Sequence, residues 1–280
     1  MQATRKRTDP EAFVRALAPA LRQSASIARA LEGRVANRPK AGETTAVKAA
    51  LTIADTASQE ALLVPLLEHF PTVRLAAEED TPSTIHFASA GPELVVIDPI
   101  DGTLRFYLEG AGPYAVMIGL ACEREYTAAL VALPREELYL DAVRGQGARI
   151  AQLGSPPRPA RAEATGKRVY VSHNVPEAAR ESLRRRGFEV APACGGAIAV
   201  APLVPGACAG LRIAEEPESD LSIRGRIGLL IAAEAGALVR GEDGAAFPLD
   251  IEVRARALLV AASPFELSAL EAALAAAGLS

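Results

Sequence analysis

The sequence contains no tryptophan, and only 4% of its 280 residues are aromatic. Proteins often stack an adenine or another base on such side chains, so their scarcity argues mildly against a nucleotide ligand. The three cysteines are widely spaced and form no CxxC pattern, which excludes a disulfide framework and a zinc knuckle. A reducing, cytoplasmic setting is therefore expected.

An excess of positive charge is also absent. With 30 Lys and Arg against 34 Asp and Glu, the net charge is −4, so no overall basic field can hold nucleic acid or an anionic membrane. The long uncharged run at 190–211 contains prolines and glycines that disfavour a membrane-spanning helix, and the N-terminus does not resemble a secretory signal. We expect no nucleic-acid partner and no membrane partner.

Half of the residues are hydrophobic, which is typical of a globular chain that buries a large core. A tract rich in proline, glycine and charge at 154–167 is the best linker candidate. We expect an α+β domain over 1–155 and an α/β domain over 165–280, with an active site between them.

Capping residues and apolar spacing predict the individual elements. The expected helices cover 9–33, 55–70 with Asp55 as N-cap, 176–187, 222–235 and 264–278. Strands are expected at 73–77, 94–97, 168–172, 188–193 and 209–213, as an antiparallel meander over 113–153, and as a pair at 237–241 and 245–249.

The most informative segment is LVVIDPIDGT at 94–103, an apolar strand that leads into Asp98 and Asp101. The short turn between these acids can aim both carboxylates to one side, where they repel each other unless a cation binds. Since no His or Cys is nearby, a hard ion is expected, Mg²⁺ ahead of Ca²⁺ or Mn²⁺. The amides of Gly102 and Thr103 can begin a helix whose N-terminus binds phosphate.

An Asp-Gly pair alone would indicate only a turn, but the whole segment resembles the first signature of the inositol monophosphatase superfamily. These Mg²⁺-dependent, lithium-sensitive phosphatases include bisphosphate nucleotidases and some fructose-1,6-bisphosphatases. Three more elements follow the family order, namely T-x-x-D at 52–55, paired glutamates at 78–79 and G-x-G-A at 145–148. The chain is identified as a member, which implies an α/β fold of the layered αβαβα type.

The resemblance also implies roles for particular residues. The metal ligands would be Glu78, Asp98, the carbonyl of Ile100, and Asp101. Asp98 would bridge two Mg²⁺ ions, and a site can hold two or three. The catalytic residues would be Asp55 and Thr103, which would share a hydrogen bond and orient the attacking water. The substrate would be bound by Gly102, Thr103, Gly195 and Gly196. Glu79 is expected to be a supporting or surface acid.

The C-terminal half departs from the family pattern W-D-x-A-A-G. Counting back from Glu234, the expected aspartate falls on Arg224 and the tryptophan on Ile223, so the second metal site is compromised. Asp220, one helical turn earlier, could replace the ligand, or Arg224 could take the place of the cation and bind phosphate. Alternatively, the enzyme is weakened or inactive, or Arg224 is merely solvated. Acids near Asp220 could bind sugar or inositol hydroxyls.

The expected function is Mg²⁺-dependent hydrolysis of a small phosphate monoester, with an inositol monophosphate-like substrate first. A 3′(2′),5′-bisphosphate nucleotide and a sugar bisphosphate are the alternative substrates. The alternative of another class is a weakened or inactive homologue that binds a metal or phosphate. The expected partner is a small phosphorylated metabolite, and the resemblance suggests a homodimer.

Overall fold

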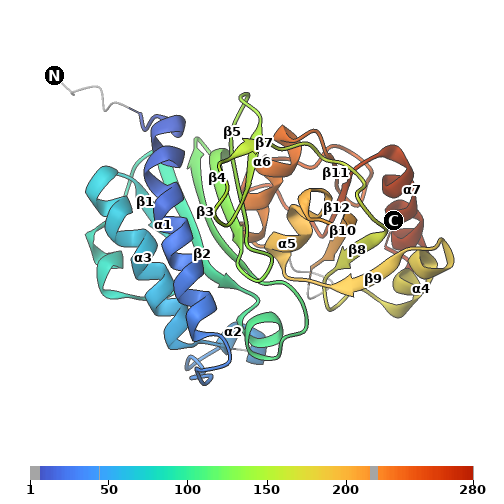
Figure 1. Ribbon diagram of the computed structural model, residues 1–280, viewed down its shortest axis with the longest axis horizontal. Helices are drawn as coiled ribbons and strands as arrows, with labels where there is room; N and C mark the ends of the chain where they lie inside the picture. Colours follow the sequence, from blue (N-terminus) through green and yellow to red (C-terminus); the bar gives the residue numbers. More distant parts are fainter. Residues whose placement is uncertain (1–6, 44, 215–219, 280) are drawn as a thin grey trace.

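The structure is a computed structural model that describes residues 7–43, 45–214 and 220–279. Five layers alternate between helices and sheets (Figure 1). The outer helices on one side are α1 (Pro10–Leu31) and α3 (Ile53–His69), the inner helices are α5 (Gly195–Ala199) and α6 (Ile227–Glu234), and the outer helices on the other side are α4 (Glu177–Arg185) and α7 (Pro264–Ala276). This order confirms the expected αβαβα sandwich.

The first sheet follows chain order, and its strands β3 to β6 confirm the predicted meander. Its strands are β1 (Arg74–Ala76), β2 (Glu93–Asp101), β3 (Ala115–Cys122), β4 (Glu125–Leu133), β5 (Leu138–Val143), β6 (Ala148–Gln152) and β7 (Arg158–Pro159). Only the β1–β2 pair is parallel. Consequently the chain segments after β1 and β2 lie at the same edge of the sheet, which brings the glutamate pair at 78–79 close to Asp98.

The second sheet has the order β11-β12-β10-β8-β9. Its strands are β8 (Arg168–Val171), β9 (Glu189–Pro192), β10 (Ala207–Ile213), β11 (Leu238–Arg240) and β12 (Ala257–Ala261). The strand predicted at 237–241 is confirmed as β11, but the partner strand predicted at 245–249 is wrong, because β11 pairs with β12 and Ala246 makes only an isolated bridge to Arg240. Strand β12 is buried throughout and lacks the alternation by which a half-buried strand is recognised.

The N-cap prediction for α3 also needs correction. Its N-cap is Thr52, whose side chain accepts from the backbone N–H of Ala54, while Asp55 is the third helical residue. Asp55 accepts in return from the backbone N–H of Thr52 at 2.7 Å, which completes a capping box. The carboxylate of Asp55 is thereby held at the buried start of the helix.

Helix α6 lies between the two sheets and joins their cores. Ile227 and Leu230 pack in the cluster of the first sheet, whereas Leu229 packs with Leu258 and Val260 of the second. Such a helix is apolar all round rather than amphipathic. The two sheets separate between β7 and β8, within the predicted linker, and the division into domains stays a prediction. No helix in the described ranges is long and apolar enough to span a bilayer.

Two shorter helical segments complete the surroundings of the site. One is α2 (Ala46–Ala49), which packs against the turn at Thr103–Leu108. That turn was predicted to begin an α-helix, but Phe106 and Tyr107 both donate backbone N–H groups to the carbonyl of Gly102, at 2.9 and 3.2 Å. The wider ring closed by Tyr107 makes this a single π-type turn instead.

Candidate active site

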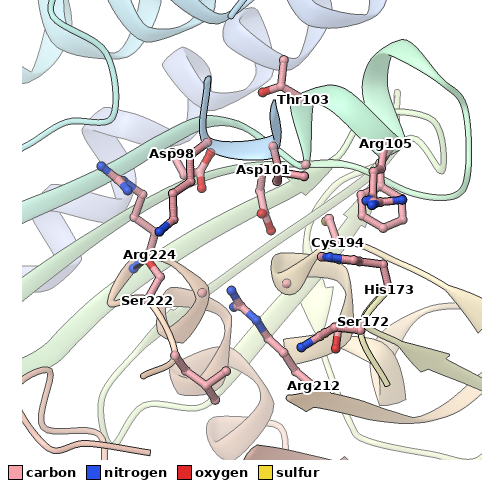
Figure 2. A pocket seen from close by; sticks show the side chains of 18 of the residues that line it. Asp98, Asp101, Thr103, Arg105, Ser172, His173, Cys194, Arg212, Ser222 and Arg224 are labelled. Atoms are coloured by element: carbon pink, nitrogen blue, oxygen red, sulfur yellow. Dashed lines mark hydrogen bonds between the residues drawn. The ribbon is translucent and has the colours of Figure 1, made fainter. Parts of the chain in front are cut away.

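A pocket of about 450 Å³ opens where the ends of β2, β8 and β10 meet the start of α5. Its acids are Glu43, Glu78, Asp98, Asp101 and Asp220, and its cations are Lys40, Lys48, Arg105, Arg212 and Arg224. Figure 2 shows Asp98 and Asp101 on one wall, with Arg224 beside Asp98 and Arg212 reaching toward them from the opposite wall. The pocket therefore combines carboxylates that can hold a cation with guanidinium groups that can hold an anion.

The acids of the first motif lie at an irregular end of β2. The strand was expected to end before Asp98, but it continues to Asp101, and its register against β3 shifts between these two residues. Gly102 follows with φ +88°, and a Cβ there would lie 2.5 Å from a ring carbon of Phe106. Glycine is required at this turn, because any side chain would be both strained and obstructed.

Asp98 is the most unusual group in the pocket. It is 6% exposed, and its Oδ1 is buried without a hydrogen-bond partner. Burial and the carboxylates of Glu78 and Asp101 raise the pKa of Asp98 well above its usual range, while the charge of Arg224 acts in the opposite direction. Negative charge is thus concentrated beside a buried oxygen that lacks a partner.

The expected catalytic pair is held together in the structure. The Oγ of Thr103 lies 2.8 Å from Asp55 Oδ1 and 2.9 Å from the carbonyl oxygen of Ile100. A hydroxyl has one proton, so Thr103 donates to one of these acceptors at a time. Burial is the main cause that raises the pKa of Asp55, and hydrogen bonds from Thr52 and Thr103 oppose it.

The residues expected to bind substrate divide into two groups. Gly102, Thr103 and Gly195 line the pocket. Gly196 instead donates its backbone N–H to Asp101 Oδ2 at 2.5 Å, and a Cβ there would lie 2.5 Å from the sulfur of Met117. Gly196 therefore positions Asp101 and allows α5 to approach the first sheet.

Glu79 is buried, with 4% exposure, and does not line the pocket. It accepts from Lys40 Nζ at 2.9 Å, and its backbone exchanges hydrogen bonds with the amide of Gln59. This acid supports the segment that carries Glu78, in agreement with the supporting role expected for it.

The structure distinguishes between the interpretations of the C-terminal departure. Arg224 donates to the carbonyl oxygen of Ala77 at 3.2 Å, next to Glu78, and its charge lowers the pKa of Asp98. Asp220 is at the pocket wall but pairs with Arg254 at 3.4 Å. Arg224 is thus not a solvated residue without contacts. The neighbouring acids at 215, 216 and 218 lie outside the described residues.

Sequence reasoning missed Arg212 and Lys40, which both line the pocket. Arg212 follows an apolar run that predicts strand β10, and a charged residue near the end of such a strand was the available signal. Lys40 lies in a turn-rich region and offered no comparable signal.

The fit of the carboxylates to a metal can be tested directly. In the described ranges, no group of three or more His, Cys, Asp or Glu side chains is spaced to hold a metal ion. Glu78 and Asp98 nevertheless adjoin each other, and the unpartnered Oδ1 of Asp98 is a donor atom of the hard type. The residues therefore fit one hard cation beside Asp98, whereas Asp101 is engaged by Gly196.

Comparison with known proteins identifies the family of the chain. The sequence profile of the Inositol monophosphatase family matches residues 11–199, and the chain belongs to this family. Mouse inositol monophosphatase 2 is 32% identical over 140 residues, which are 49% of this chain and 46% of the mouse protein. The chain thus spans about half the length of the curated relative that it matches.

Solved structures share the fold. An inositol monophosphatase from Thermotoga maritima superposes with a TM-score of 0.72 at 18% identity, covering 96% of this chain and 98% of the other. An IMPase/NADP phosphatase, solved in complex with Mg²⁺ and phosphate, superposes with a TM-score of 0.65 at 17% identity, covering 94% and 96%. At such identities the likeness establishes the fold, and the activity needs its own argument.

Proposed function

We propose that this protein hydrolyses a small phosphate monoester with the help of Mg²⁺, and that an inositol monophosphate-like compound is the first candidate substrate. The observation that carries the proposal is the buried Asp98 beside Glu78, with an oxygen that lacks a partner, next to the Thr103–Asp55 hydrogen bond. Family membership and the Mg²⁺ and phosphate in one structural neighbour support it.

The proposed ligands of the main cation are Glu78, Asp98 and the carbonyl oxygen of Ile100. A bound divalent ion supplies charge that polarises a phosphoryl group and lowers the pKa of water. The turn at Gly102 and Thr103, which shares the pocket with these acids, is the proposed seat of the phosphate. A phosphate there would lie beside the cation that neutralises it.

Thr103 and Asp55 would orient the attacking water. Both oxygens of Asp55 accept hydrogen bonds, two from Thr52 to Oδ2 and one from Thr103 to Oδ1. When Thr103 donates its proton to Asp55, its lone pairs remain able to accept a hydrogen bond from water. The capping box of α3 therefore determines where that water sits.

Arg224 is proposed to take the place of a second metal ion. Its guanidinium lies near Asp98, and Asp101, the other expected ligand, already accepts from Gly196. Arginine can bind phosphate through two parallel hydrogen bonds but carries no acidic water for the leaving group. We therefore expect slower turnover than in an enzyme with two or three ions.

A weakened or inactive homologue that only binds phosphate stays the second candidate, and the substitution of Arg224 for aspartate is the observation that favours it. A bisphosphate nucleotide or sugar bisphosphate is the alternative substrate. A homodimer is proposed on the family resemblance, and a cytoplasmic location on the three widely spaced cysteines.

The test is phosphate release from inositol 1-phosphate, 3′-phosphoadenosine 5′-phosphate and fructose 1,6-bisphosphate, with and without Mg²⁺. Mg²⁺-dependent release that is lost in Glu78→Gln and in Asp101→Asn would support the enzyme. Folded protein that releases no phosphate from any of them, yet binds phosphate by calorimetry, would favour the inactive homologue.

A further inference from the structure

We propose that Arg212 forms a second anion site, which selects phosphate monoesters that carry another phosphate or carboxylate group. The inference rests on the proposed function, and it favours substrates with a second anionic group over the inositol monophosphate-like candidate. Arg212 extends from β10 toward the central space that Asp101 enters from the opposite wall (Figure 2).

Two glycines make room for the Arg212 side chain. A Cβ at Gly195, the first residue of α5, or at Gly225, next to Arg224, would overlap Arg212 Nη1. Neither glycine has the positive φ that would by itself require the residue. The absence of side chains at both positions instead forms a slot for the guanidinium, which fixes its direction into the pocket.

Among the described residues, the guanidinium in this slot has no carboxylate partner. Its Nη1 is enclosed against Gly195 and Gly225 and has no hydrogen-bond partner among the described residues, while Arg212 also lines the pocket. Arginine side chains keep their positive charge in proteins, so this charge stays in the slot. An anion in the pocket would supply a negatively charged partner, since it would accept charge-assisted hydrogen bonds from the part of the guanidinium that faces it.

The positions of the charges suggest two anions rather than one. The phosphate to be hydrolysed belongs beside Asp98 and the turn at Gly102, on the wall made by the first sheet. Arg212 enters from the second sheet, and Arg224 lies at the side near Asp98 (Figure 2). A ligand with anionic groups at both ends would satisfy the two walls together, whereas a monophosphate with only hydroxyls would offer Arg212 neutral acceptors and no charged partner.

The test compares matched substrates in the wild-type protein and in Arg212→Gln. The pairs are fructose 1-phosphate with fructose 1,6-bisphosphate, and glycerol 1-phosphate with 3-phosphoglycerate, so that phosphate and carboxylate are examined separately. In Arg212→Gln we expect kcat/KM for the doubly anionic member to fall about 10- to 100-fold, mainly through KM. The singly anionic member should change less than about twofold, since it makes no contact there.

Two further variants separate the position of the Arg212 guanidinium from its charge, and a third variant is the control. Gly225→Ala keeps Arg212 but fills its slot, so the variant should lose the preference for a second anionic group. Arg212→Lys keeps the positive charge but cannot donate two parallel hydrogen bonds, so this variant should retain part of the preference. Arg185→Gln, an exposed arginine of α4 outside the pocket, should leave both members of each pair unchanged. Melting temperatures establish that every variant is folded.

An equal loss for both members of each pair would overturn the proposal, because Arg212 would then act on the reacting phosphate itself. No change for either member would also overturn it. If the wild-type protein hydrolyses nothing, the proposed function fails, but calorimetry with fructose 1,6-bisphosphate and fructose 1-phosphate in EDTA still tests the site. Binding of the bisphosphate that is weaker in Arg212→Gln would then support it, and equal binding would exclude it.

Discussion

The two walls of the pocket differ in charge and in how closely they follow the family pattern. The wall from the first sheet presents Glu78, Asp98 and Asp101, each at its expected motif position. The wall from the second half presents Arg212, Asp220 and Arg224, and the resemblance to the family predicts an aspartate at the position of Arg224. The first wall therefore carries the acids proposed to hold a cation, while the second wall carries the two arginines proposed to bind anions.

This difference shows that a chain can share the fold of its family while individual residues of its pocket differ from the family pattern. The chain keeps the fold even though the charge on one wall is changed, because the core residues of α6 that join the sheets are independent of Arg224. Substitution at a pocket wall changes what binds there and leaves the packing between the layers intact.

The largest expected effect comes from the first wall. Asp98→Asn should reduce kcat/KM by about 100-fold or more, since removal of a metal ligand is at least as costly as removal of its supporting contacts. The melting temperature without Mg²⁺ should stay the same or rise, because the amide no longer repels Glu78 and Asp101. Phosphate release and thermal unfolding measured on one preparation check both points, and full activity in the variant would contradict the metal site.

The second-largest effect is expected when the charge at Arg224, on the other wall, is reversed. Arg224→Asp should lower stability in EDTA by about 1–3 kcal/mol, because Asp98 loses a nearby cation and gains another carboxylate. Mg²⁺ should restore much of the lost stability in Arg224→Asp. The stability of Arg224→Gln should rise less when Mg²⁺ is added, because glutamine adds no carboxylate. Melting curves with and without Mg²⁺ provide the measurement, and a variant that is indifferent to Mg²⁺ would show that no ion binds beside Asp98.

The third effect is the contribution of Asp98, on the first wall, to the pH dependence of stability. The raised pKa of Asp98 means that the folded protein holds a proton that the unfolded chain releases, so stability falls as pH rises from the usual aspartate pKa toward the raised value. The slope is at most about 1.4 kcal/mol per pH unit within that window. Urea unfolding in EDTA at several pH values should show a shallower slope in Asp98→Asn, and an identical slope would contradict the shift.

A smaller effect is expected at the cap of α3, which supports the first wall. Thr52→Ala removes the N-cap hydrogen bond and one of the bonds to Asp55, at a cost of about 1 kcal/mol in stability. Because Asp55 positions Thr103, kcat/KM should also fall about 10-fold. Unfolding and steady-state kinetics test this, and a change in stability alone would mean that the cap does not position the water.

The smallest effect on activity belongs to the matching cap of α7, which lies on the outer face of the second sheet. Ser263→Ala should also cost about 1 kcal/mol, since Ser263 accepts from the N–H of Phe265 and donates to the buried Glu266. Its kcat/KM should remain within about twofold of wild type. An activity loss as large as that of Thr52→Ala would show that helix caps affect turnover through stability alone.

Most elements could be predicted from the sequence where local chemistry decides them. The meander at 113–153 and the helix capped by Asp9 follow from local spacing and capping residues. Strand β12 and the true cap of α3 were missed, because β12 is buried on both faces and because Thr52 and Asp55 are both acceptable caps. The reciprocal capping box of Thr52 and Asp55 makes Thr52 the cap, and Thr103 adds a hydrogen bond to Asp55 from a distant part of the chain.

By itself, the sequence determined the class of protein and the acids of the first wall, because Asp98, Asp101 and Thr103 belong to one continuous motif. The tertiary structure alone decided that Arg224 lies beside Asp98, that Gly196 binds Asp101, and that Arg212 occupies a slot between two glycines. The physical reason is separation along the chain. A charge at the end of β10 acquires its partners only when the second sheet and α5 close against the end of β2.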